Sequence, residues 1–101
     1  MPAGASPRVA VIGCGYWGRN LVRNFSEIGA LDALVDAHAP TAHALSAKHG
    51  GRILTVEQVL ADDAVDAVAI AAPAAAHHAL AKAALNARKH VFVEKPLALR
   101  A

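Results

Sequence analysis

Apolar positions in this 101-residue chain form short continuous runs that alternate with longer stretches of helical spacing. A short continuous apolar run is typical of a strand that helices cover on both faces, as in a parallel sheet. Strands are predicted at residues 8–12, 31–35, 52–54, 65–71 and 90–93. Helices are predicted between them, from the turn after residue 12 to about residue 28, over 41–49, from 55 through 60, and from about 75 to 87.

Turn and cap residues mark several of the predicted helix ends. Gly29 ends the first helix as a C-terminal glycine, and Pro40 suits the first turn of the second, where its missing N–H is harmless. Thr55, with Gln58 three places later, predicts a capping box that opens the third helix. The connections between elements are therefore expected to be short.

Alternation of strand and helix from Arg8 onward predicts an α/β fold, with right-handed crossovers and helices on both faces of a parallel sheet. The expected architecture is a Rossmann-type doubly wound sheet with strand order 3-2-1-4-5. We expect one domain over residues 8–101, preceded by a loose tail over residues 1–7. A cofactor would lie across the carboxyl ends of the first and fourth strands, where the order reverses.

Composition narrows the class of protein. The chain is 55% hydrophobic but only 4% aromatic, and the excess is largely alanine, which suits helices packed closely on a sheet. The net charge of +2 comes from scattered basic residues, so no nucleic-acid surface is predicted, and Arg19 and Arg23 are interpreted as a solvated helix face. A single cysteine, Cys14, excludes an internal disulfide and favours a reducing, cytoplasmic setting.

Neither a targeting segment nor a membrane segment is predicted. Residues 1–7 lack the positive start and apolar stretch of a signal peptide, and no apolar stretch reaches the roughly 18 residues that a membrane helix needs. The six histidines predict no metal site, because no cysteine or carboxylate accompanies them at the spacing of metal ligands.

Three glycines, Gly13, Gly15 and Gly18, follow the first predicted strand with the spacing G-x-G-x-x-G. In a dinucleotide-binding unit the first glycine makes the tight turn, the second lets the backbone approach the pyrophosphate, and the third lets the helix pack closely on the strand. The positive end of the helix dipole attracts the phosphates. Asp36 follows the second strand, near the position of a carboxylate that holds the adenosine ribose. The alternative is a purely structural glycine turn between strand and helix.

Asp36 also favours NAD over NADP, because its carboxylate would face the additional phosphate of NADP with like charge, and no arginine follows in the next two positions. Within the glycine turn, Cys14 is interpreted as a small turn residue, because the sequence places no base beside it. Tyr16 and Trp17 either flank the cofactor or pack on the sheet edge or on a second domain.

A resemblance to a known family rests on several motifs together. They are Gly13-Cys14-Gly15-Tyr16-Trp17-Gly18 with Asn24-Phe25, then Asp36, then Pro73 with His77, and finally Lys89-His90-Val91-Phe92-Val93-Glu94-Lys95-Pro96-Leu97. The chain resembles the N-terminal nucleotide-binding domain of the glucose-fructose oxidoreductase, inositol dehydrogenase and MocA family, written Gfo/Idh/MocA. Glu94-Lys95-Pro96 is the most specific of these motifs, and the match covers nearly the whole chain from Arg8.

The resemblance implies an oxidoreductase that moves a hydride between NAD or NADP and a sugar, cyclitol or related polyol. Lys95 would lie by the nicotinamide and hydrogen-bond the reacting oxygen as the carbonyl forms; the alternative is a surface lysine before a loop proline. His77 would lie near the nicotinamide, or else be a solvated residue at a helix start. The cofactor-binding residues implied, besides the three glycines and Asp36, are Tyr16, Trp17, Ala72, Pro73, His77, Glu94, Lys95 and Pro96.

Three features depart from the family's pattern. Arg88 stands where the helix before the last strand commonly ends in glycine; because a left-handed turn would cost an arginine roughly 1 kcal/mol, we expect a rearranged helix end. Ala72 replaces a hydroxyl residue before Pro73, which removes one polar contact to the cofactor. Family enzymes continue into a second α/β domain that supplies the substrate pocket, most oligomer contacts and the acid/base partners, and nothing of that domain follows Ala101.

The chain is therefore predicted to be the cofactor half of an oxidoreductase that acts on a sugar or polyol, as a fragment, a truncated gene product or a half-protein that needs a partner. A non-catalytic nucleotide-binding module and an inactive truncated fragment are the alternatives. Glu94-Lys95-Pro96 argues against a pure binder, which has no need of a lysine at that place.

Overall fold

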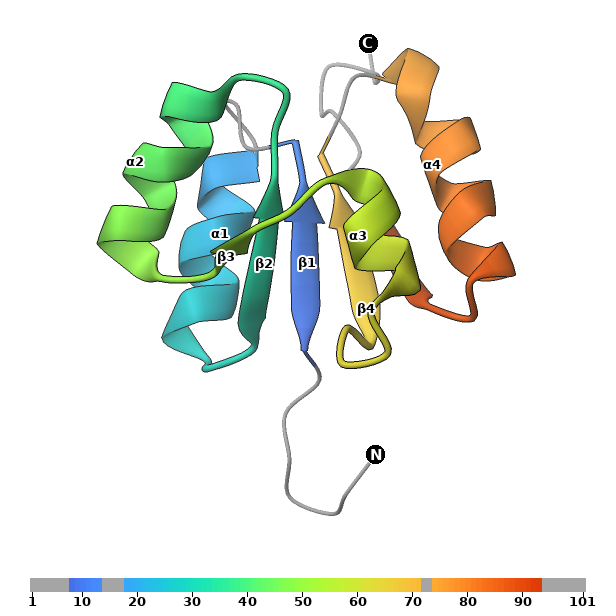
Figure 1. Cartoon of the computed structure of the whole chain (residues 1–101), viewed down its shortest axis with the longest axis horizontal. Coiled ribbons are helices and arrows are strands. Elements are labelled where there is room, and N and C mark those ends of the chain that lie inside the picture. The colour runs from blue at the N-terminus through green and yellow to red at the C-terminus, as the bar shows by residue number, and fades with distance from the viewer. Residues whose placement is uncertain (1–7, 14–17, 72–73, 94–101) are drawn as a thin grey trace, which may run out of the picture.

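The computed structural model describes residues 8–13, 18–71 and 74–93, in which strands and helices alternate (Figure 1). The strands are β1 (Val9–Ile12), β2 (Leu31–Val35), β3 (Arg52–Ile53), β4 (Ala67–Ile70) and β5 (His90–Val93). The helices are α1 (Gly18–Glu27), α2 (Ala39–His49), α3 (Val56–Ala61) and α4 (Ala74–Asn86). Every predicted element is present, and the predicted ends are accurate to within two residues.

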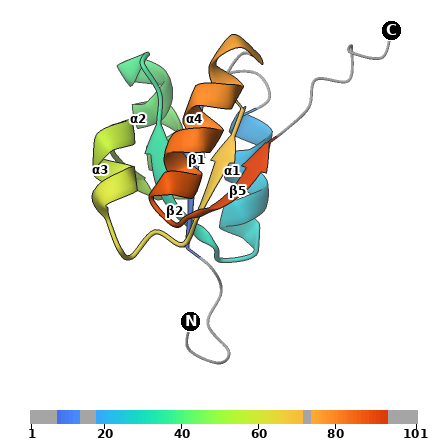
Figure 2. The ribbon, with the colours of Figure 1, turned by 90° about the vertical axis from the view of Figure 1, so that its right-hand side faces the viewer.

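The five strands form one sheet in the order β3-β2-β1-β4-β5, and all neighbouring pairs are parallel, which confirms the predicted topology. β1 lies at the centre, where its Ile12 is beside Val35 of β2 and Ile70 of β4. α1 and α3 lie on opposite sides of this sheet (Figure 2). The strand order reverses between β1 and β4, so the carboxyl ends of these two strands flank the switch point of a doubly wound fold.

Two apolar cores form because successive side chains of a strand point to opposite faces of the sheet. Val9 and Val11 of β1 pack in the core beneath α1, whereas Ala10 and Ile12 pack in the core beneath α3 and α4. Every residue of β1 is buried, which explains why the strand is continuously apolar rather than alternating. Each fully buried large aliphatic side chain contributes about 1.5–3 kcal/mol, so this strand anchors both layers.

The predicted capping box at the start of α3 is confirmed. The N–H of Gln58 donates to Thr55 Oγ1 at 3.1 Å, and the N–H of Thr55 donates to Gln58 Oε1 at 2.9 Å. Two N–H groups that the helix itself cannot bond are thereby satisfied. This reciprocal pair lets a helix of six residues begin at a defined position.

The end of α4 is not rearranged, so that expectation was wrong. Arg88 adopts the left-handed conformation itself, with φ of 63°, and is the one non-glycine residue with positive φ in the described part of the chain. Its N–H donates to the carbonyl of Leu85 at 2.9 Å, and the N–H of Lys89 donates to the carbonyl of Ala84 at 3.0 Å. These are the two bonds of a Schellman motif, which satisfies carbonyl groups at the helix end.

A buried carboxylate that the sequence does not single out lies near the amino end of β2. The side chain of Asp32, in β2, is 3% exposed and forms ion pairs with Arg8 and with Arg52, the latter at 2.7 Å. Arg52 also pairs with Asp62 at 2.7 Å. Burial raises the pKa of Asp32, but the hydrogen bonds and charges of Arg52 and Arg8 outweigh it, so the pKa lies below its ordinary value.

Candidate functional site

The residues that follow three neighbouring strands lie at the same level of the sheet, and two of them, Gly13 and Asp36, are predicted site residues. Ile12, Val35 and Ile70 are aligned across β1, β2 and β4, and the next residues in the chain are Gly13, Asp36 and Ala71. The Gly13 N–H donates to the carbonyl of Val35 at 2.8 Å, and the Ala71 N–H donates to that of Ile12 at 2.8 Å. The strand pairing thus extends one residue further and brings these positions together at the carboxyl edge.

The first and third glycines each meet a local requirement that other residues would not. Gly13 has φ of 90°, a conformation that side chains with a Cβ rarely adopt. A Cβ on Gly18 would overlap the carbonyl oxygen of Gly13, so the start of α1 approaches the end of β1 as closely as backbones allow. The resulting strand-to-helix turn has the close approach that a pyrophosphate-binding turn needs.

Asp36 is half-buried just beyond β2, and its side chain is held by a hydrogen bond within the loop that follows. Its Oδ1 accepts the N–H of His38 at 2.8 Å, which turns the chain into α2. His38 Nδ1 lies 2.8 Å from Thr41 Oγ1, which links this loop to the first turn of α2. A carboxylate held in this way, beside the strand that carries the glycine turn, can accept hydrogen bonds from two neighbouring ribose hydroxyls.

The remaining predicted site residues lie outside the described residues. They are Cys14, Gly15, Tyr16, Trp17, Ala72, Pro73, Glu94, Lys95 and Pro96. His77 belongs to α4 by its backbone, and its side chain is likewise outside the description. Their proposed roles stay predictions.

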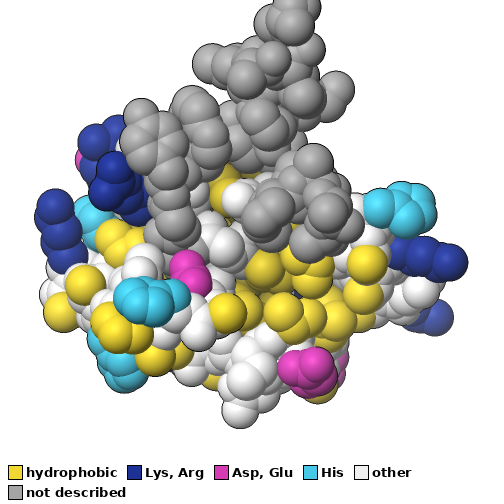
Figure 3. Space-filling view, turned by 90° about the horizontal axis from the view of Figure 1, so that it is seen from above, with side chains coloured by type: hydrophobic (Ala, Val, Ile, Leu, Met, Phe, Trp, Pro, Cys, Tyr) yellow, Lys and Arg dark blue, Asp and Glu magenta, His cyan; other side chains and the backbone are white. Residues whose placement is uncertain are grey.

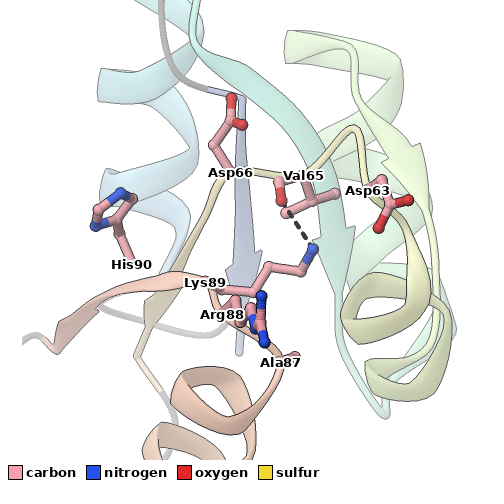
Figure 4. Close-up of a pocket in the computed structure, with 7 residues that line it drawn as sticks. All are labelled: Asp63, Val65, Asp66, Ala87, Arg88, Lys89 and His90. Carbon is pink, nitrogen blue, oxygen red and sulfur yellow. Dashed lines mark hydrogen bonds between the residues drawn. The ribbon is translucent and has the colours of Figure 1, made fainter. Parts of the chain in front are cut away.

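A groove of about 390 Å³ lies at the opposite edge of the sheet, by the amino ends of β4 and β5 (Figure 4). Its lining residues are Asp63, Val65, Asp66, Ala87, Arg88, Lys89 and His90. Lys89 crosses the groove and donates from Nζ to the carbonyl oxygens of Asp62 at 2.7 Å and Val65 at 2.9 Å. Lys89 is only 6% exposed, and its ammonium group hydrogen-bonds to the protein backbone.

No three His, Cys, Asp or Glu residues within the described ranges come together as a group that could hold a metal ion. None of the helices in the same ranges is both long enough and apolar enough to cross a lipid bilayer.

The sheet order β3-β2-β1-β4-β5, with Gly13 and Asp36 at the carboxyl ends of β1 and β2, is that of a Rossmann fold, the class of domain that binds nicotinamide dinucleotides. Residues 7–101 match the model of the family GFO_IDH_MocA, described as an oxidoreductase family with an NAD-binding Rossmann fold. The chain belongs to this Gfo/Idh/MocA oxidoreductase family. The resemblance inferred from the motifs is therefore confirmed.

Characterised relatives include sugar and cyclitol dehydrogenases. The UDP-N-acetylglucosamine 3-dehydrogenase of Acidithiobacillus ferrooxidans is 36% identical over 93 residues, which cover 91% of this chain and 29% of that protein. Its solved structure superposes with a TM-score of 0.82. Inositol 2-dehydrogenase 1 of Saccharopolyspora erythraea is 37% identical over 100 residues, which cover 93% of this chain and 30% of that protein.

A third relative shows the other nicotinamide cofactor. The 3-ketoreductase KijD10 of Actinomadura kijaniata, solved in complex with NADP and TDP-benzene, is 30% identical and superposes with a TM-score of 0.81, covering 92% of this chain and 30% of that one. This chain thus spans about 30% of the length of these relatives.

Proposed function

We propose that this domain binds NAD for a dehydrogenase that exchanges hydride with a hydroxyl group of a sugar, cyclitol or related polyol. The observation that carries the proposal is the juxtaposition of Gly13 and Asp36, which the 2.8 Å hydrogen bond from Gly13 N–H to the Val35 carbonyl fixes at one edge. The names of the related dehydrogenases support the substrate class. One cysteine in the chain suits the reducing environment of the cytoplasm.

The residues present fit this cofactor. Gly13 has a positive φ angle, and there is no room for a Cβ at Gly18. These two glycines therefore allow the backbone of the turn to approach a pyrophosphate closely. We assign Gly13, Gly15 and Gly18 to the pyrophosphate, where the N–H groups at the start of α1 would donate to phosphate oxygens. Asp36 would accept from the adenosine ribose hydroxyls.

The chemistry of hydride acceptance belongs to the nicotinamide when it is bound. In our proposal Lys95 donates a hydrogen bond to the substrate oxygen and stabilises the charge on it as the carbonyl forms. Tyr16, Trp17, Ala72, Pro73, His77, Glu94 and Pro96 would surround the cofactor. The chain spans about 30% of the length of such an enzyme. We assign the substrate pocket, the acid/base partner and most oligomer contacts to the remaining part.

Titration of the chain with NAD and with NADP tests the cofactor assignment. A carboxylate about 4 Å from a phosphate charge costs about 1–4 kcal/mol between aqueous and protein-surface dielectric, so we expect NAD to bind at least fivefold more tightly than NADP. Asp36→Ala should weaken NAD binding and abolish that preference, whereas Asp63→Ala, at the opposite edge, should change neither. Equal or tighter binding of NADP by the wild type would remove the argument from Asp36.

Catalysis needs a separate test in a full-length enzyme that contains this domain. Lys95→Met should lower kcat by a factor of about 10² or more and should weaken NAD binding by a much smaller factor, because the lysine is assigned to the substrate oxygen as well as to the cofactor beside it. Unchanged turnover in that variant would favour the alternative of a lysine without a catalytic role.

A further inference from the structure

The loop between β2 and α2 holds the carboxylate that is assigned above to the adenosine ribose. Asp36 Oδ1 accepts the N–H of His38 at 2.8 Å, so the direction of the carboxylate depends on where the backbone of residue 38 lies. The contact is a turn in which an aspartate side chain bonds the backbone two residues on. Figure 3 shows this edge of the sheet from above, with acidic and histidine side chains both visible on the side where α2 lies.

The backbone of residue 38 is held in turn by the start of α2. His38 is the N-cap of this helix, with φ of −94° and ψ of 97°, and its side chain makes no capping hydrogen bond to the helix backbone. The ring instead meets a side chain, because Nδ1 lies 2.8 Å from Oγ1 of Thr41. The Thr41 N–H also donates to the His38 carbonyl at 3.1 Å. Thr41 therefore holds residue 38 at two points, one of which is its hydroxyl group.

The first turn of α2 is a firm support for these contacts. Ala42, the residue after Thr41, is buried, and its N–H donates to the His38 carbonyl at 3.4 Å. Pro40 fixes the backbone φ angle within the same turn. A chain of contacts therefore runs from the anchored start of α2 through His38 to Asp36.

We propose that Thr41 is a positioning residue for Asp36, which acts through His38 and sets the preference of this domain for NAD over NADP. Because this role concerns the carboxylate assigned to the ribose, it rests on the proposed function. Hydrogen bonds weaken steeply as they depart from linearity, and the repulsion between two charges falls with distance. A carboxylate that can turn away therefore binds NAD less well and repels NADP less. Loss of the Thr41 hydroxyl should thus weaken NAD binding alone.

Titration of the 101-residue chain with NAD and with NADP, in the variants Thr41→Val and His38→Ala, tests this role. Each variant should bind NAD about threefold more weakly, as for the loss of one exposed hydrogen bond, without weaker binding of NADP. Thr41→Ser, which keeps the hydroxyl, should bind as the wild type does. Ser46→Ala is the matched control, because it removes a hydroxyl hydrogen bond of 2.8 Å at the other end of the same helix and should leave both affinities unchanged.

A further substitution at residue 38 separates holding of the loop from direct contact of the imidazole with the cofactor. Asparagine is among the best N-cap residues, because its side chain accepts an N–H of the first helical turn. His38→Asn should therefore hold residue 38 by a different bond and keep the wild-type ratio of NAD to NADP affinity without the ring. A ratio as low as that of His38→Ala would mean that the imidazole itself meets the cofactor, which would overturn the positioning of Asp36.

Amide hydrogen exchange gives a readout that needs no cofactor. Thr41 is not a sequence neighbour of His38, so its substitution leaves the intrinsic exchange rate of the His38 amide unchanged. We expect this amide to exchange about threefold faster in Thr41→Val than in the wild type, and at the wild-type rate in Thr41→Ser. Unchanged exchange in Thr41→Val would overturn the inference. Equal weakening of NAD and NADP binding would also overturn it, because that result is the mark of a general loss of structure.

Failure of this role and failure of the proposed function give different results. A preference for NAD that Asp36→Ala abolishes and Thr41→Val retains in full would leave the proposed function in place and overturn only the role of Thr41. A wild-type chain without a preference for NAD would overturn both. A preference that Asp36→Ala abolishes and Thr41→Val lowers about threefold would support both.

Discussion

Arg88 ends α4 in the same backbone conformation with which Gly29 ends α1. Their φ angles are 63° and 75°, and each residue donates its N–H to the carbonyl three positions earlier, at 2.9 Å for Arg88 and 3.0 Å for Gly29. The following residue in each case donates to the carbonyl five positions earlier, at 3.0 Å and 2.8 Å. One chain thus contains the same helix-ending motif with and without its usual glycine.

Replacing the arginine should stabilise the domain. Arg88→Gly removes the cost of a left-handed side-chain-bearing residue, and we expect a gain of about 1 kcal/mol in the free energy of unfolding. For a domain of this size that corresponds to an increase in Tm of about 4–8 °C.

The matched control is Gly29→Ala. A Cβ at Gly29 would have no atom within 4 Å, so that substitution measures the backbone cost alone and should lose about 1 kcal/mol. Urea denaturation of both variants checks the pair. A destabilised Arg88→Gly variant would show that the guanidinium makes a contribution larger than the strain.

Asp32 should make stability depend on pH in the acid range. Its folded-state pKa lies below the ordinary value of 3.8, so its contribution is fully present above about pH 4 and is lost as the pH falls through the lower folded value. Asp32→Asn should lose about 2 kcal/mol at pH 7, since hydrogen bonds to charged groups typically contribute this much. The difference in stability between wild type and variant should shrink below pH 4, as urea titrations at pH 7 and pH 3 would show. A constant difference, or a similar loss in Asp63→Asn, would contradict this role.

Sequence patterns predict an element correctly where the residues that determine it lie close together in the chain. The apolar runs gave β1 and β5, and the Thr55 and Gln58 spacing gave the start of α3, because each signal depends on residues close together in the chain. The role of Asp32 is not predictable from the sequence, because its partners Arg8 and Arg52 are 24 and 20 residues away and only the folded sheet brings them within reach. The conformation of Arg88 is not predictable from its local preference of about 1 kcal/mol alone, because two backbone hydrogen bonds at the helix end oppose that preference.

Lys89 should contribute to stability through its two backbone acceptors. Lys89→Met keeps most of the apolar length of the side chain but leaves the carbonyls of Asp62 and Val65 without this donor, so we expect a loss of about 1–3 kcal/mol. Lys82→Met, at an exposed position on α4, should change stability by less than about 0.5 kcal/mol. Equal stability of the two variants would mean that water replaces the ammonium group at no cost.

The candidate site was predictable to the extent that it follows from topology. Parallel strands end at one edge, so the order 3-2-1-4-5 by itself brings the residues after β1, β2 and β4 together. The interpretation of Arg19 and Arg23 as a solvated helix face is confirmed, because both residues are exposed on α1.

Gly18 gives the sharpest test of the glycine turn, because its requirement is steric. A Cβ there would overlap the carbonyl oxygen of Gly13, so Gly18→Ala must push α1 away from β1. We expect a loss of about 1–3 kcal/mol in stability, as for overpacking elsewhere, together with at least tenfold weaker NAD binding. Gly50→Ala is the control, since its φ of 83° imposes a backbone cost of about 1 kcal/mol while a Cβ meets no atom within 4 Å. That variant should bind NAD with unchanged affinity. If calorimetric titration instead found wild-type affinity in Gly18→Ala, the close approach of helix to strand would be a packing feature and the pyrophosphate would have to be held by other groups.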